Sequence, residues 1–376
     1  MENKSTRIYG LDLTRAIAIL LVLISHTSYI FKESSNPILD LFGFQGVEIF
    51  FVLSGFLIGN ILLKIINSAS FSFSDITYFW VRRWFRTLPL YFLILLVNIG
   101  IAYFVGYEIT DNLWVYFVFL QNFSSEHILF FPESWSLSVE EYAYIFAPIT
   151  LFIGSVFFKN KQKLFLLITI LLIFVFTFSK VFYHIKYMNH PSSLDFWNLN
   201  LKAVVIYRLD AIYYGFIMAY LYSYKETFFK KNRYNLFLIG CVLASILHLV
   251  IPMSGIVIET HPLYFNVLYL PLNTIAITLF LPFLYYIRKP HIKLQSIVLK
   301  ISVYSYAMYL LHYTFILYLM QLIYPFEDLN LYQKTICVFV YLSITYLLSS
   351  IVYKYYEKPL TSLRDKSFFK RLVKPD

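Results

Sequence analysis

Arg15 and His26 stand eleven residues apart inside the first long apolar stretch of the chain, residues 9–31. On an α-helix eleven residues make almost three turns, so both side chains lie on one stripe, about 16 Å apart along the axis. A charged group and an imidazole are costly in lipid, and such residues usually face a protein-lined cavity. The pair therefore indicates a membrane enzyme rather than a passive membrane protein.

The titratable residues in and beside the apolar stretches, Arg15 and His26 among them, form two clusters at different expected depths in the membrane. The inner cluster is cationic, and guanidinium groups of this kind bind phosphate through paired hydrogen bonds; it comprises Arg15, Arg82, Arg83 and Arg86. The outer cluster combines an imidazole with carboxylates, which suits general-base activation of a hydroxyl group; it comprises His26, Glu48, Glu140, Arg208 and Asp210. Together they predict a phosphate-bearing donor inside, an acceptor outside and a group passed between them.

Each cationic or imidazole candidate has a plainer alternative. His26 is interpreted as the catalytic base, against the alternative of a buried, hydrogen-bonded packing residue. Arg15 could contact the phosphates of the donor or neutralise Asp12, three residues earlier, and the two roles can coexist. Arg83 and Arg86 share a helix face and are predicted to bind the donor, whereas Arg82 is interpreted as an ordinary cytoplasmic anchor.

The carboxylate candidates are separated by helix geometry. Glu140 and Glu141 lie about 100° apart on a helix, so only one can face a given cavity. Glu140 shares its face with Tyr144 and is preferred, either to orient His26 or to contact the acceptor. Arg208 and Asp210 point nearly opposite ways on the expected helix, so each is expected to bridge to another helix.

Two further polar positions in the apolar stretches remain open. His312, near the middle of its stretch, either packs or lines the substrate cavity. Ser54 beside Gly55 is interpreted as a close-packing site rather than a nucleophile. Five residues are assigned to substrate binding: Glu48, Tyr144, Arg208, Asp210 and His312.

The elements that must position these residues are membrane helices. Hydrophobic residues make up 59% of the 376 and charged residues only 14%, far from the averages of soluble domains. Ten apolar runs are long enough to span a bilayer: 9–31, 46–66, 87–105, 141–158, 163–183, 203–223, 236–252, 263–287, 299–323 and 335–353. A shorter run, 113–120, predicts a half-helix. The sequence thus predicts an all-α membrane domain over residues 1–360, followed by a short basic tail over 361–376.

The basic residues predict the orientation of these helices. With a cytoplasmic N-terminus, 24 of the 31 Lys and Arg residues fall in inner segments, which is the bias that sets topology. The C-terminus is then cytoplasmic too, and the net charge of +10 suits anionic lipid rather than nucleic acid. Cys241 and Cys337 lie inside expected spans, so neither a disulfide nor a metal site is predicted.

Seven blocks of residues, in order along almost the whole chain, resemble the acyltransferase-3 family of membrane acyltransferases. The first two are Leu11-Asp12-xx-Arg15 with His26, and Gly46-Val47-xx-Phe50-Phe51-x-Leu53-Ser54-Gly55. The next are Arg83-xx-Arg86-xx-Pro89, Trp135-Ser136-Leu137-xx-Glu140-xxx-Tyr144 and Arg208-x-Asp210-xxxx-Gly215. The last are Ser302-x-Tyr304-Ser305-xxx-Tyr309-Leu310-x-His312 and Glu357-x-Pro359. One block would be weak, but seven in order are specific.

The resemblance implies a ten-helix enzyme of a bacterial inner membrane that moves an acyl group, usually acetyl, from acyl-coenzyme A. The acceptor would be a sugar hydroxyl of a cell-surface glycan or a lipid-linked saccharide, and no metal is implied. Arg15, His26, Arg83 and Arg86 match the functional signatures of the family. The chain resembles the form without a C-terminal SGNH-type esterase domain, which leaves room for a separate periplasmic partner that completes the transfer.

Two rival functions fit part of the pattern. A transporter or flippase of a glycan or small anionic substrate would also place polar residues near the midplane of ten helices. Against it, the sequence has no inverted repeat and no pair of broken helices at corresponding positions. A nonenzymatic membrane sensor or assembly subunit is the third interpretation, and it predicts that His26→Ala causes no catalytic defect.

Overall fold

The computed structural model describes residues 7–31, 36–68 and 70–365, and within these ranges it contains helices and no strands. The long apolar runs explain this fold, because a helix satisfies every backbone hydrogen bond within its own segment, as lipid requires. The all-α membrane fold expected from the sequence is confirmed.

The α-helices begin and end at the following residues: α1 Tyr9–His26, α2 Ser28–Phe31, α3 Pro37–Ile66, α4 Phe73–Val105, α5 Trp135–Phe157, α6 Lys161–Tyr187, α7 Leu194–Trp197, α8 Leu209–Tyr224, α9 Glu226–Lys231, α10 Arg233–Ser245, α11 Ile251–Met253, α12 Leu270–Tyr285, α13 Ile292–Leu311, α14 Tyr318–Ile323, α15 Leu331–Val352 and α16 Lys358–Leu363. Short 3₁₀ turns are η1 Leu113–Val118, η2 Pro132–Ser134, η4 Val205–Tyr207 and η8 Phe326–Asp328. Wider π-helical turns are η3 Asn198–Lys202, η5 Ile246–Val250, η6 Tyr264–Tyr269, η7 His312–Leu317 and η9 Tyr353–Glu357.

Nine helical segments of the described chain are long and apolar enough to cross a membrane, so the protein is a multi-pass membrane protein. The one expected span that is not among these nine is 203–223, where the helix is shorter than predicted. Its helix, α8, starts only at Leu209 and has 16 residues, because η3 and η4 occupy the preceding residues. The expected half-helix at 113–120 is the 3₁₀ turn η1, which ends where Phe119 adopts a left-handed backbone with φ 60°.

Two other boundaries bear on the site. α3 and α4 start at Pro37 and Phe73, well before the apolar runs predicted at 46–66 and 87–105. The three arginines of α4 therefore lie inside the helix instead of at its entry. The basic tail predicted at 361–376 is described only as far as 365, and the rest of it lies outside the described residues.

The described chain divides into two compact units. Unit 1 comprises residues 7–50, 82–109 and 284–365, and unit 2 comprises 51–81 and 110–283. α3 and α4 each contribute one part to unit 1 and another to unit 2. The single domain predicted over 1–360 stays a prediction.

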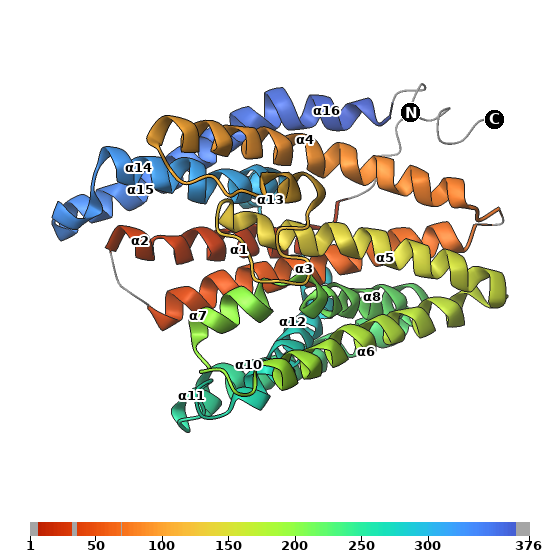
Figure 1. Ribbon diagram of the computed structural model, residues 1–376. Coiled ribbons are helices and arrows are strands. Elements are labelled where there is room, and N and C mark those ends of the chain that lie inside the picture. Colours follow the sequence, from red (N-terminus) through yellow and green to blue (C-terminus); the bar gives the residue numbers. More distant parts are fainter. Residues whose placement is uncertain (1–6, 32–35, 69, 366–376) are drawn as a thin grey trace. The chain divides into compact units, whose positions relative to one another are not determined.

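In unit 1, α13 packs against both α1 and α15 (Figure 1). The first part of α3 approaches α1 closely at Gly46. A Cβ atom there would lie 2.7 Å from the carbonyl oxygen of Ala18 and 2.7 Å from Cγ2 of Val22. Any larger residue at Gly46 would therefore push against the turn of α1 that leads to His26.

In unit 2, α5, α6 and α8 pack against one another (Figure 1). The second part of α3 meets α8 at two glycines, Gly55 and Gly215. A Cβ atom on Gly55 would lie 1.9 Å from the carbonyl oxygen of Ile212, which no side chain movement could relieve. This close approach confirms the packing interpretation of Gly55.

Candidate active site

His26 is the last residue of α1, and its ring is fixed by the helix backbone. Nδ1 lies 2.8 Å from the carbonyl oxygen of Val22. Because a carbonyl oxygen only accepts, Nδ1 must carry the hydrogen and donate it. In the neutral ring Nε2 then holds the lone pair, so Nε2 is the atom that can accept a proton. The half-buried His26 has the tautomer that a general base needs.

His312 has the same arrangement on a second helix. It opens the π-helical turn η7, and its Nδ1 lies 2.7 Å from the carbonyl oxygen of Tyr309, to which it donates. The side chain is buried, and Nε2 has no hydrogen-bond partner among the described residues. The packing of α1 on α13 brings the centroids of the two imidazole rings to 4.7 Å, with the planes at 85°.

Two tyrosines complete the surroundings of His26. Tyr29, on the short helix α2, stacks on the imidazole at 5.9 Å, and Tyr313 meets it edge to face at 5.0 Å. The tyrosine rings are themselves 5.3 Å apart. Aromatic rings with polar tips suit a ligand that is partly apolar and partly hydroxylated.

Arg15 belongs to a polar network between α1 and α13. Its Nη1 donates to Oγ of Ser302 at 3.2 Å, and that hydroxyl donates to Oδ1 of Asp12 at 2.7 Å. The guanidinium lies 3.7 Å from the same carboxylate oxygen. The expected neutralisation of Asp12 by Arg15 is confirmed, and contact with the donor stays a prediction.

The arginine segment of α4 is held in unit 1 by the C-terminal helices. Pro89 cannot donate to the carbonyl of Phe85, four residues earlier, and the hydroxyl of Thr361 reaches that oxygen at 3.4 Å. Tyr306 and Tyr356 donate to the carbonyls of Thr87 and Pro89 at 2.7 and 3.1 Å.

The three arginines in that segment have different surroundings. Arg82 pairs with Asp365 at 2.8 Å, so it is tied to the end of the described chain. Arg83 is half-buried, and Arg86 is exposed. Arg86 interacts electrostatically with the buried carboxylate of Glu357. Of the three, Arg86 is the most accessible to a phosphate in solution.

Glu48 and Glu140 belong to different units. Glu48 is fully buried on α3 in unit 1. Glu140 lies on α5 in unit 2, where Ser54 donates to its Oε1 at 2.9 Å and Tyr144 donates to its Oε2 at 2.6 Å. The backbone carbonyl of Tyr144 accepts a hydrogen bond from Trp80 at 2.8 Å. Glu140 and Tyr144 share a face, as predicted, and Ser54 joins them.

Arg208 and Asp210 do not lie on one helix as expected, because Arg208 precedes α8 as its N-cap. Asp210, in the first turn, pairs with Lys180 of α6 at 2.5 Å and accepts from Thr177 at 3.0 Å. Arg208 is completely buried and lies over the ring of Phe51 at 5.7 Å. The bridging expected of Asp210 is therefore present, and its partner, Lys180, lies near the end of the apolar run 163–183.

The loop between α4 and α5 contains buried polar residues that the sequence analysis did not single out. Asn122 donates to the carbonyls of Trp135 and Ala203, which joins the loop to the segment before α8. His127 donates from Nε2 to the carbonyl of Pro132 at 3.0 Å. Burial lowers the pKa of His127 from 6.5 to about 4, and this hydrogen bond opposes the shift.

The sequence profile of the acyltransferase-3 family, described as an acyltransferase domain, matches residues 8–355. The chain therefore belongs to this family of membrane acyltransferases, as the seven blocks indicated. No solved structure gives a significant match.

Several bacterial relatives match part of the chain. Peptidoglycan O-acetyltransferase OatA of Listeria monocytogenes (serovar 1/2a, strain EGD-e) is 29% identical over 170 residues, 41% of this chain and 26% of OatA. YrhL of Bacillus subtilis (strain 168), whose name as a peptidoglycan O-acetyltransferase is provisional, is 32% identical over 182 residues, 44% of this chain and 27% of YrhL. The matched region thus spans about a quarter of each relative.

Proposed function

We propose that this chain is a membrane O-acetyltransferase that moves an acetyl group from acetyl-coenzyme A to a hydroxyl group of a cell-wall glycan. The observation that carries the proposal is the hydrogen bond from Nδ1 of His26 to the carbonyl of Val22, which leaves Nε2 of the neutral ring to accept a proton. Family membership supports the acyl-transfer chemistry. The names of the relatives support an acetyl group and a peptidoglycan-type acceptor.

His26 acts as the general base in this proposal. Nε2 takes the proton of the acceptor hydroxyl while the oxygen attacks the thioester carbonyl. The tetrahedral intermediate then collapses, the carbon–sulfur bond breaks, and the proton passes from the imidazolium to the departing thiolate. The products are the O-acetyl ester and free coenzyme A. His312, in ring contact with His26, is assigned to the acceptor side of the site.

Arg83 and Arg86 bind the phosphates of the donor in this proposal. The exposure of Arg86 supports it, because a guanidinium at the surface can reach a phosphate in solution. Arg15 contributes positive charge farther along the stripe of α1, while Asp12 and Ser302 fix its position. Glu48, Glu140, Tyr144, Arg208 and Asp210 keep their predicted roles as catalytic or acceptor-side residues.

The membrane is the cytoplasmic membrane of a bacterium, with both ends of this chain on the inner side. The distribution of Lys and Arg along the sequence supports this orientation, and the relatives are bacterial proteins. Donor and acceptor then approach from opposite faces, and a periplasmic partner could pass the acetyl group on.

The experiment that tests the proposal uses the protein in nanodiscs with radiolabelled acetyl-coenzyme A and peptidoglycan fragments as acceptor. His26→Asn keeps an amide donor near Val22 but lacks the second ring nitrogen. We expect it to lower label transfer about 10²- to 10⁴-fold while leaving donor binding intact. Arg86→Gln should weaken donor binding, because it removes the guanidinium.

The matched control is His291→Asn, which changes an exposed histidine at the start of α13. It should leave both transfer and donor binding at the wild-type level. Failure of folded wild-type protein to bind acetyl-coenzyme A would overturn the donor assignment. Full label transfer by His26→Asn would overturn the role of the imidazole.

A further inference from the structure

A hollow with basic walls lies where α9 ends and α10 begins, in unit 2. It has a volume of about 630 Å³ and is lined by Glu226, Thr227, Lys230, Lys231, Arg233 and Tyr234. None of these residues belongs to the predicted acyl-transfer site. The lining carries three positive charges and one negative charge, so its net charge favours an anion.

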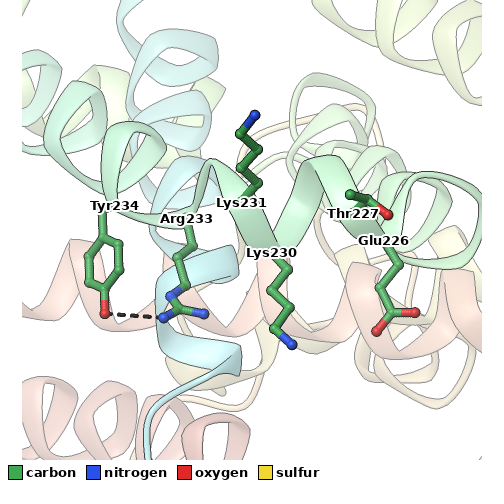
Figure 2. A pocket seen from close by; sticks show the side chains of 6 residues that line it. All are labelled: Glu226, Thr227, Lys230, Lys231, Arg233 and Tyr234. Atoms are coloured by element: carbon green, nitrogen blue, oxygen red, sulfur yellow. Dashed lines mark hydrogen bonds between the residues drawn. The ribbon is translucent and has the colours of Figure 1, made fainter.

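Most of the charged side chains that line this hollow point to the same side of the helix. Figure 2 shows that Lys230, Arg233 and Tyr234 point to one side, with Glu226 on that side one turn earlier, while Lys231 points the opposite way. Arg233 donates to the hydroxyl of Tyr234 at 3.2 Å, and its guanidinium lies 4.7 Å from the centre of that ring. Two cations and an aromatic ring therefore form one wall.

An exposed apolar face of α10 continues from this wall. Tyr234, Leu238 and Val242 follow one another at four-residue steps and are 60%, 63% and 52% exposed. The opposite face of α10 packs on α12, where a Cβ atom on Gly240 would lie 2.8 Å from the ring of Phe280. Of the nine candidate spans, 233–253 is the least buried, at 11% of its window.

We propose that this surface is a binding site for one anionic phospholipid. The phosphate lies between Lys230 and Arg233, and an acyl chain runs along Tyr234, Leu238 and Val242. A phospholipid fits because the cationic wall continues into an exposed apolar stripe. A soluble phosphate would contact the cationic wall alone. The orientation given by the Lys and Arg distribution places the site at the cytoplasmic leaflet, where anionic lipids concentrate.

Native mass spectrometry of the purified full chain, titrated with phosphatidylglycerol, tests this site. We expect phosphatidylglycerol to bind more tightly than phosphatidylcholine. Each basic residue near a lipid surface contributes about a fivefold increase in affinity, so Lys230→Gln with Arg233→Gln should weaken phosphatidylglycerol binding about 25-fold. Leu238→Gln should weaken it as well and leave binding of inorganic phosphate unchanged.

A control variant separates the geometry of the site from the net charge of the protein. Lys289→Gln with Lys293→Gln removes two exposed charges outside the hollow, before and at the start of α13. This variant should bind phosphatidylglycerol as wild type does. Equal binding of the two lipids or an unchanged Lys230→Gln/Arg233→Gln variant would each overturn the proposal, without bearing on acetyl transfer.

Discussion

Polar side chains have different surroundings in the two units of this protein. In unit 2 two carboxylates meet cations or hydroxyls directly: the buried Asp210 meets Lys180, and the half-buried Glu140 accepts from Ser54 and Tyr144. In unit 1 His26 and His312 each donate Nδ1–H to a carbonyl of their own helix. That bond fixes the ring and leaves Nε2 as the proton-accepting atom.

The two kinds of surroundings suit two different tasks, one structural and the other the transfer of a proton. A buried ion pair joins two helices, and its loss leaves a charge in a medium that cannot solvate it. An imidazole with a fixed tautomer has one nitrogen that can accept a proton. We therefore expect variants of Lys180, which has no predicted role in the reaction, to change mainly stability, and variants of His26 to change mainly rate.

The largest effect on stability is expected from Lys180→Met. This change leaves Asp210 buried without its cation, and the loss of one partner of a buried pair costs about 3–5 kcal/mol. The double variant Lys180→Met/Asp210→Leu removes both charges and should recover most of that loss. The measurement is the free energy of unfolding in a titration with sodium dodecyl sulfate. Equal stability of wild type and Lys180→Met would show that the pair does not hold α6 to α8.

A smaller effect is expected from the protonation of His127. Its pKa is about 4 in the folded protein and 6.5 when unfolded, so between these values only the unfolded state binds the proton. Stability should then fall as the pH is lowered from about 6.5 to 4, by at most about 3 kcal/mol. Thermal unfolding of wild type and His127→Gln across this range checks it, and the two pH profiles should differ in slope. Identical slopes would contradict the buried neutral ring.

The smallest of these effects is expected from Tyr144→Phe. It removes the hydroxyl that donates to Oε2 of Glu140, and a hydrogen bond to a charged group contributes about 1.5–3 kcal/mol. Because Glu140 is half-buried, the lower end is expected. Tyr142→Phe is the matched control, since its hydroxyl makes only a 3.5 Å contact with the carbonyl of Val118. Equal destabilisation by the two variants would show that the hydrogen bond from Tyr144 to Glu140 does not stabilise the protein.

Much of the fold could be predicted from the sequence, because a membrane helix requires a continuous run of apolar residues. The family resemblance also supplied the candidate site residues in order along the chain, and their roles stay predictions. The partner of Asp210 could not be predicted, since Lys180 is 30 residues away in the sequence and no spacing rule pairs the two. Its position at the end of the apolar run 163–183 was a signal, because a lysine there needs a partner in lipid.

The tautomers of His26 and His312 also could not be predicted from the sequence. Nothing in a residue pattern states which ring nitrogen faces a carbonyl, because that depends on the rotamer within the helix. The π-helical turn that starts at His312 was equally hidden, since apolar periodicity does not distinguish it from an α-helix. The start of α8 after Arg208, rather than before it, was missed for the same reason.

The most direct test compares His26→Asn with the control His291→Asn in two assays on the same preparations. One assay measures cleavage of the acetyl-coenzyme A thioester in the presence of acceptor, and the other measures the free energy of unfolding. We predict that His26→Asn loses cleavage about 10²- to 10⁴-fold with wild-type stability, whereas His291→Asn keeps both cleavage and stability at the wild-type level. Cleavage at the wild-type rate by folded His26→Asn would contradict the central claim.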